Sequence, residues 1–149
     1  MKPTCTWILI ADAGRARVLE SRGPGKGLRP VAAMTSEADL PATHDLVTDR
    51  QARAFERGNP TRHAIEPKTD PRDQLKAQHL ADIARRVEQQ HLAGAFDRLV
   101  VVAPPHALGV LRGAIGDRLR AVVRGEIAKD LTKVPDHEVA AHLADVIRL

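Results

Sequence analysis

The residues with the clearest capacity for chemistry are four arginines in the middle of the chain. Arg50, Arg53, Arg57 and Arg62 are followed by His63, and Glu56 is the one acidic residue among them. A planar guanidinium pairs with phosphate through two parallel hydrogen bonds, so this cluster predicts contact with the backbone of RNA. The alternative interpretation is an exposed loop whose charge is balanced by Asp and Glu residues on either side.

A second group of basic residues follows the last expected strand. Lys129 and Lys133 lie beside Asp130 and Thr132. Strand ends in α/β sheets are common places for ligand sites. We therefore add Lys129 and Lys133 to the predicted RNA- or anion-binding residues, with a capped turn into the last helix as the alternative interpretation.

Patterns typical of metal and cofactor sites are incomplete. His137 and His142 are separated by five positions, which places them about 140° apart on a helix and prevents both from binding one zinc ion. The glycine loop GPGKG lacks the Ser or Thr that follows the lysine of a phosphate-binding loop, and a strand follows it. A single cysteine, Cys5, excludes an internal disulfide and is interpreted as a buried small hydrophobic residue. We predict no metal and no cofactor.

Hydrolytic chemistry has little support in the residue pattern. A two-metal nuclease needs clustered carboxylates, whereas the first expected strand has none and Asp12 only follows it. Ser21 and Ser36 are the only serines, and neither lies in a G-x-S-x-G turn. We predict no catalytic residues. One alternative stays open, a hydrolase whose acid–base groups come from the long loop: His63, Glu66 and Asp70.

Composition sets the class of protein. The chain has 149 residues, 43% of them hydrophobic, and a net charge of +4 that permits an anionic partner. Trp7, Phe55 and Phe96 are the only aromatic residues, which disfavours sites built on stacked bases. No stretch approaches the length of a membrane span, and the apolar run ending at Ala11 is short for a signal peptide. We expect a cytoplasmic protein without membrane contact.

Hydrophobic periodicity predicts the elements that must position these residues. We expect strands at 4–11, 15–20, 28–35, 98–103 and 121–128, and helices from about Asp70 to Gly94, over 105–119, and from about Pro135. Pro30 confines the third strand to an edge. With right-handed crossovers, the sheet order becomes 3-2-1-4-5. The predicted fold is a single α/β domain over 1–149, a five-stranded mixed sheet with helices on both faces and a long basic loop at about 36–69.

Several segments together resemble the bacterial host attachment protein family, whose members are described as required for attachment to host cells. These segments are TWILIADAGRARVLE, LVTDRQARAF, RHAIEPKTDP, LVVVAPPHALGVLR and EIAKDLTKVPDHEVAAHL. They cover nearly the whole chain in order. The family is similar in fold to the middle domain of archaeal and eukaryotic peptide-release factors, a ribonuclease H-like topology.

The resemblance implies a role on the ribosome or RNA. In those release factors a Gly-Gly-Gln tip occupies the topological place of the long loop, and this chain has no Gly-Gly-Gln. The resemblance therefore does not imply hydrolysis of peptidyl-tRNA by that route. We predict a non-enzymatic module that binds the ribosome or RNA, with a protein-interaction factor acting indirectly in attachment as the alternative.

Overall fold

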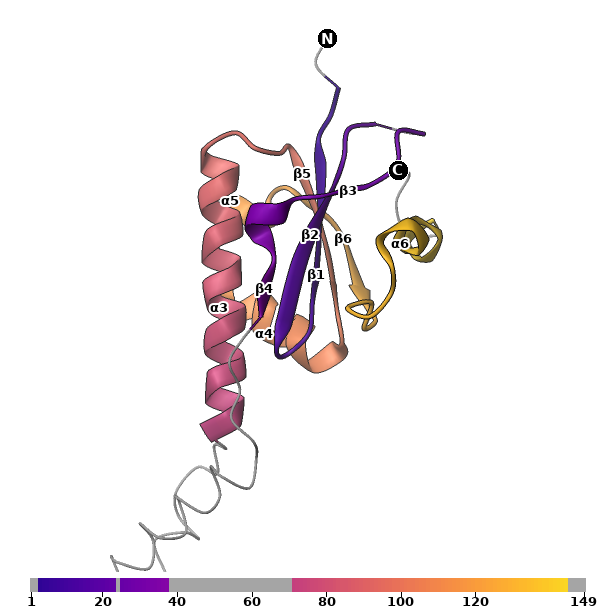
Figure 1. The fold of residues 1–149 in the computed structure, drawn as a ribbon. Coiled ribbons are helices and arrows are strands. Elements are labelled where there is room, and N and C mark those ends of the chain that lie inside the picture. Colours follow the sequence, from indigo (N-terminus) through magenta and orange to yellow (C-terminus); the bar gives the residue numbers. More distant parts are fainter. Residues whose placement is uncertain (1–2, 24, 38–70, 145–149) are drawn as a thin grey trace, which may run out of the picture.

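A mixed sheet forms the centre of the computed structural model, which describes residues 3–23, 25–37 and 71–144 (Figure 1). Strand β1 (Thr6–Ala11) pairs antiparallel with β2 (Arg15–Ser21) on one side and parallel with β5 (Arg98–Ala103) on the other. Strand β6 (Val123–Ala128) continues the parallel part beside β5. The order β3-β2-β1-β5-β6 confirms the predicted α/β class and the order of its strands.

The expected third strand, 28–35, is wrong in detail because two short strands replace it. Strand β3 (Arg29–Pro30) and strand β4 (Ser36–Glu37) pair with opposite ends of β2, so the sheet has six strands rather than five. Between them a 3-10 turn (Ala32–Met34) leaves the ladder and buries Met34 in the core. The predicted long loop also begins too early, since residues 36 and 37 form β4 and the rest of that range, 38–69, lies outside the described residues.

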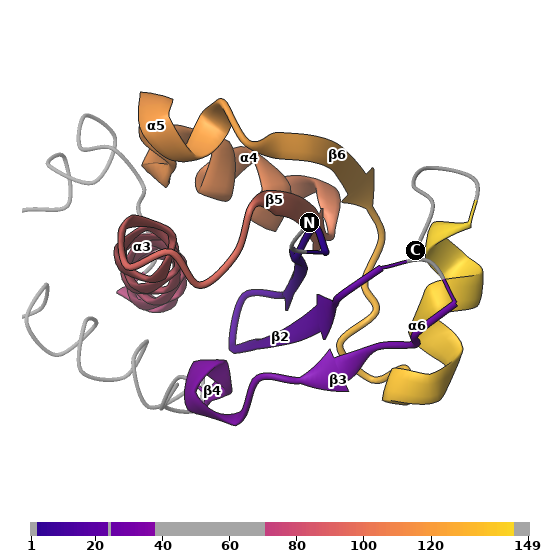
Figure 2. The same cartoon turned by 90° about the horizontal axis from the view of Figure 1, so that it is seen from above.

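Helices cover both faces of the sheet, as predicted (Figure 2). Helix α3 (Pro71–Leu92) and helix α4 (Pro105–Ala114) pack on the face that carries Trp7, Leu9 and Val101. Helix α6 (Asp136–Leu143) packs on the opposite face, where Val139 and Leu143 meet Ile8, Ile10 and Val100. The expected contacts of Val146 and Ile147 lie outside the described residues.

The expected helix over 105–119 is interrupted. Helix α4 ends at Ala114, Ile115 is extended, and a short helix α5 (Asp117–Arg120) follows Gly116. A Cβ atom on Gly116 would lie 3.2 Å from the Glu88 carboxylate, so glycine allows α3 to approach closely. The Arg120 guanidinium donates to the carbonyls of Arg112 and Ile115, which satisfies acceptors at the end of α4.

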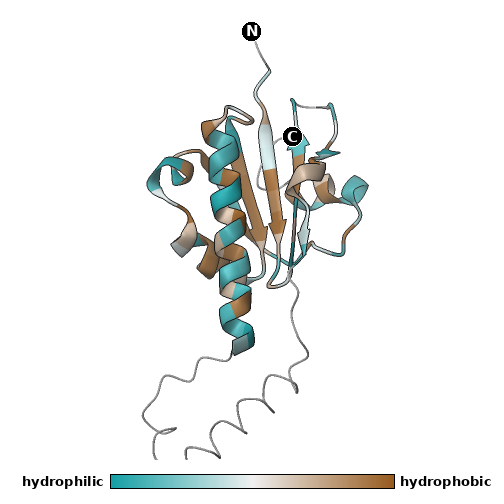
Figure 3. Ribbon diagram, turned by 60° about the vertical axis from the view of Figure 1, so that its left-hand side comes forward, coloured by the Kyte–Doolittle hydropathy of each residue, from teal (hydrophilic) through white to brown (hydrophobic). Residues whose placement is uncertain are grey.

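Helix α3 has the apolar stripe that the sequence predicts, and its outward side is polar (Figure 3). Leu80, Ile83, Ala84 and Val87 are buried, and Gly94 follows the helix with a φ of +81° that glycine adopts readily. No helix within the described ranges is both long enough and apolar enough to cross a lipid bilayer.

Arg17 fastens the segment after β6 to the sheet. Its Nη1 donates to the Thr132 carbonyl at 2.6 Å, and its Nη2 donates to the carbonyls of Leu131 and Val134 at 3.3 and 2.5 Å. Its Nε lies 3.1 Å from Asp136 Oδ1 at the start of α6, an ion pair without the alignment of a hydrogen bond. One side chain of β2 therefore contacts four residues of the segment 131–136 and helps to fix its position.

Replacing Arg17 by Ala should lower the free energy of unfolding by about 2 kcal/mol, because hydrogen bonds from a charged donor are lost and buried carbonyls lose their partner. Urea unfolding measures the change. The matched control is Arg15→Ala, which removes an exposed arginine from the same strand and should change stability by less than about 0.5 kcal/mol. Equal losses in the two variants would contradict this role of Arg17.

Candidate functional site

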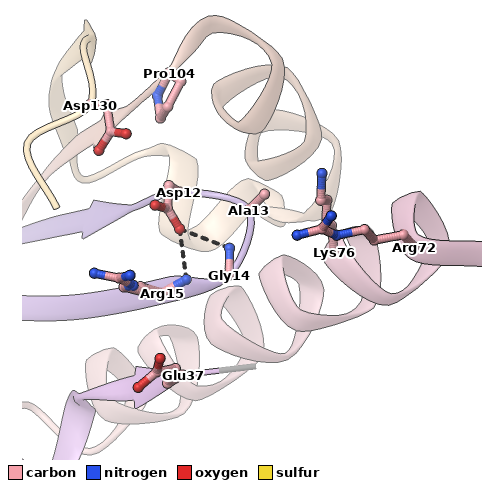
Figure 4. Close-up of a pocket in the computed structure, with 9 residues that line it drawn as sticks. All are labelled: Asp12, Ala13, Gly14, Arg15, Glu37, Arg72, Lys76, Pro104 and Asp130. Atoms are coloured by element: carbon pink, nitrogen blue, oxygen red, sulfur yellow. Dashed lines mark hydrogen bonds between the residues drawn. The ribbon is translucent and has the colours of Figure 1, made fainter. Parts of the chain in front are cut away.

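A cavity of about 530 Å³ opens where the parallel strands end (Figure 4). Its lining comes from the β1–β2 turn, the residues after β5 and β6, strand β4 and the first turns of α3: Asp12, Ala13, Gly14, Arg15, Glu37, Arg72, Lys76, Pro104 and Asp130. In open α/β sheets, ligands bind outside the carboxyl ends of the strands where the connections diverge. After β1 the chain continues to β2 on one side of the sheet, and after β5 it continues to β6 on the other side. The cavity lies where these two connections diverge.

Asp12 closes the turn that forms the floor of this cavity. Its Oδ1 accepts hydrogen bonds from the backbone N–H groups of Gly14 and Arg15 at 2.8 and 2.7 Å. The Thr132 hydroxyl lies 3.1 Å from its Oδ2, and that hydroxyl shares its single proton between Asp12 and Asp130. Asp12 therefore closes the β1–β2 turn and also joins that turn to the segment after β6.

Asp130 forms a second acidic group beside Asp12. Its Oδ1 accepts from the Thr132 backbone N–H at 3.0 Å and from the Thr132 hydroxyl at 2.5 Å. The hydrogen bond from that hydroxyl holds the pKa of Asp130 below its ordinary value despite the opposing effect of partial burial. The backbone N–H of Thr132 and the charges of Lys133 and Arg15 lower this pKa further. Asp130 is therefore an ionised hydrogen-bond acceptor at neutral pH.

Basic side chains stand on the other wall of the cavity. Arg72 and Lys76 extend from the first turns of α3 toward the turn at Ala13 and Gly14 (Figure 4). Lys76 Nζ lies 3.9 Å from Asp73 Oδ1, a long and partly exposed ion pair. Helix α4 begins with Pro105 directly after Pro104, and neither proline has a backbone N–H group to direct at this space. The cavity therefore has an acidic wall and a basic wall.

The structure places the predicted site residues unevenly. Lys129 and Lys133 are exposed beside Asp130, at the edge that contains the cavity, although neither lines it. The other predicted residues lie outside the described residues: Arg50, Arg53, Arg57, Arg62 and His63. The alternative hydrolase also stays a prediction, since Glu66 and Asp70 lie in the same range.

Sequence reasoning missed the contribution of α3. Arg72 and Lys76 are four positions apart and therefore share one face of the helix. They stand in its first turns, where the helix dipole favours acidic rather than basic residues. Arg72 lies in the first turn, so a cation at the positive end of the helix dipole was the available signal of a site.

A contact between Ser36 and His79 has the composition of a nucleophile and a base. Ser36 Oγ lies 3.1 Å from His79 Nε2. To accept the serine proton, Nε2 must be unprotonated, and the ring proton then lies on Nδ1. Nδ1 is buried and has no hydrogen-bond partner among the described residues, so no third group orients the ring. The contact fastens β4 to α3 and is not a catalytic triad.

The other candidate chemical groups are also structural. Cys5 is half-buried against the core, and burial, with Glu20 nearby, raises the pKa of its thiol to about 11. The thiol is therefore protonated and unreactive at neutral pH. Within the part of the chain that the structure describes, no three His, Cys, Asp or Glu side chains gather as a metal-binding group.

Comparisons with known proteins identify relatives of both the sequence and the fold. The sequence model of the family described as "Protein required for attachment to host cells" matches residues 7–143. The crystal structure of the archaeal translation termination factor aRF1 superposes with a TM-score of 0.54 at 12% sequence identity. The superposition covers 96% of this chain and 35% of that factor, so this chain spans about a third of its length. No curated protein matches the chain in sequence.

His79 should make the stability of the fold depend on pH. Burial lowers the pKa of His79 from its ordinary value of 6.5, against the raising effect of Asp12 and Asp82 and with a further lowering by Arg86. The unfolded chain therefore binds a proton more readily than the folded one. The stability that neutral His79 contributes should be complete above pH 6.5 and decline as the pH falls below it.

Urea unfolding of wild type and His79→Gln between pH 7.5 and pH 5 tests this linkage. The wild type should lose stability more steeply than the variant as the solution is acidified. His137→Gln is the matched control, because that side chain is 80% exposed, and it should keep the wild-type slope. A His79→Gln variant with the wild-type slope would show that His79 does not cause the dependence.

Proposed function

Because the chain belongs to the family of proteins required for attachment to host cells and shares its fold with a translation termination factor, we propose that it is a non-enzymatic module that binds RNA, with the ribosome as its expected partner. At 12% identity the likeness in structure establishes the fold alone. The case for RNA therefore depends on what the surface of this chain can bind.

The observation that carries the proposal is the gathering of basic residues at one edge of the sheet. Three separate elements contribute: the β1–β2 turn, the start of α3 and the segment after β6. They bring together Arg15, Arg72, Lys76, Lys129 and Lys133. Phosphate contacts of Lys and Arg supply most of the affinity of sequence-independent nucleic-acid binding, and they need no aromatic stacking.

The acidic residues of this edge do not cancel its capacity for phosphate. Asp12 accepts hydrogen bonds from turn amides and from Thr132, so its charge is dispersed within the protein. Asp130 is likewise bound by Thr132 and has Lys133 and Arg15 in its electrostatic surroundings. In the described part of the chain, Arg15 has no carboxylate within 4 Å of its guanidinium.

The predicted arginine cluster is connected to the same edge. Glu37, the last described residue before it, lines the cavity, and Arg72, just after it, lines the cavity too. We include Arg50, Arg53, Arg57 and Arg62 in the proposal as residues of the segment that the chain inserts between these two points.

The family description supports a second candidate, a protein-interaction factor that acts in attachment to host cells through another protein. The two candidates differ in the chemistry of the partner. Binding to RNA should weaken strongly with salt and disappear after nuclease treatment, whereas a protein partner should survive nuclease.

Sedimentation with ribosomes at two or more salt concentrations tests the proposal. The protein should pellet with ribosomes at low salt and dissociate as salt rises. The logarithm of affinity should fall linearly with the logarithm of salt concentration, by about 0.7–0.9 per phosphate contact. Lys129→Ala with Lys133→Ala should reduce both affinity and slope, and replacing the four loop arginines by Ala should reduce them further.

The charge-matched control is Lys26→Ala with Arg29→Ala, which removes two cations near β3, away from the carboxyl ends of the parallel strands (Figure 1). This control should keep the affinity and the salt slope of the wild type. Salt-independent sedimentation, or equal effects of the two double variants, would refute the proposed surface. Capture of a partner that resists nuclease would favour the protein-interaction candidate.

A further inference from the structure

The cavity at the carboxyl ends of the strands has the size and the charge distribution of a small-ligand site. Its volume of about 530 Å³ falls within the usual range for ligand pockets, roughly 300–1,000 Å³. Arg72 and Lys76 stand on the α3 wall, whereas Asp12 and Asp130 lie across from them (Figure 4). Arg15 lies beside Asp12, and Glu37 adds a third carboxylate to the lining. A ligand that complements both walls carries an anion at one end and hydrogen-bond donors at the other.

The acidic wall selects donors. Both hydrogen bonds that Thr132 gives to Asp130 go to Oδ1, and among the described residues no hydrogen bond reaches Oδ2. An ionised carboxylate can only accept hydrogen bonds. Its complement in a ligand is therefore a hydroxyl or an N–H group.

The basic wall selects an anion with several oxygens. An ammonium and a guanidinium converge there from positions four apart on α3. Phosphate matches this combination, because it accepts several hydrogen bonds and carries its charge on its oxygens.

We propose that this cavity binds one ribonucleotide unit, with its phosphate against Arg72 and Lys76 and its ribose 2′-hydroxyl donating to Asp130. The inference rests on the proposed RNA association and adds to it a way of telling RNA from DNA. The 2′-hydroxyl is the group that distinguishes the two at a given site, and carboxylates accept hydrogen bonds from ribose hydroxyls in other α/β folds.

Titration of the full chain with mononucleotides tests the proposal. The probes are adenosine 5′-monophosphate, its 2′-deoxy analogue and inorganic phosphate, with binding followed by calorimetry and by amide NMR shifts. The ribonucleotide should bind about tenfold more tightly than the deoxynucleotide, the effect expected for one hydrogen bond to a charged acceptor. The largest shifts should lie at Gly14, Lys76 and Asp130.

Two variants separate the walls. Asp130→Asn should reduce the preference for the ribonucleotide, because a neutral amide oxygen accepts a weaker hydrogen bond than a carboxylate, while the phosphate contacts remain. Lys76→Ala should weaken both nucleotides about tenfold and keep the preference for ribose. The matched control Arg29→Ala, at the opposite end of the sheet, should behave as wild type. Thermal unfolding shows that each variant is folded.

The outcomes distinguish this inference from the proposed function. Equal affinity of the wild type for ribo- and deoxyribonucleotide, or no nucleotide binding, overturns the inference even where salt-dependent sedimentation with ribosomes persists. Loss of sedimentation in wild type refutes the proposed function itself. Asp130→Asn should keep or strengthen sedimentation, since it removes a negative charge, while it reduces the ribose preference. An Asp130→Asn variant that keeps the full wild-type preference for the ribonucleotide also overturns the inference.

Discussion

The burial of β1 on both faces is the constraint on which the rest of the structure depends. Each of its six side chains is at most 2% exposed. A strand buried on both faces requires cover on both sides of the sheet, which α3 and α4 supply on one face and α6 on the other. Its neighbours run antiparallel on one side and parallel on the other. The chain therefore turns sharply at Asp12, beside the carboxyl ends of β5 and β6, and the cavity forms there.

The wall of that cavity that carries Asp130 depends on polar contacts as well as on the core, in which Leu131 is buried. Residues 131–136 follow an edge strand and are held by the Arg17 guanidinium and by the shared Thr132 hydroxyl. Arg17 is 20% exposed, so solvent screens these interactions only in part. The position of Asp130 relative to Asp12 is thus set by a few directed hydrogen bonds, whereas the position of α3 is set by hydrophobic burial.

The likeness to a translation termination factor at 12% identity has a physical explanation. A fold of this kind needs a pattern of burial on strands and helices, and many sequences satisfy the same pattern. The chemistry belongs to the residues at the strand ends, which the pattern leaves free to vary. The family description concerns attachment to host cells.

The sequence by itself determined the strand order, the mixed sheet and the apolar face of α3, because alternation and helical periodicity are local signals. It missed the division of 28–35 into β3 and β4 and the break of the helix at Gly116. The first of these features depends on tertiary packing, because the turn between β3 and β4 buries Met34 in the core. Of the predicted binding residues, the structure brings Lys129 and Lys133 to the edge that α3 supplies with Arg72 and Lys76. Only the tertiary structure could show that these residues share one edge of the sheet. The contacts that hold them there, such as that of Arg17 with Thr132, join residues 115 positions apart and produce no local pattern in the sequence.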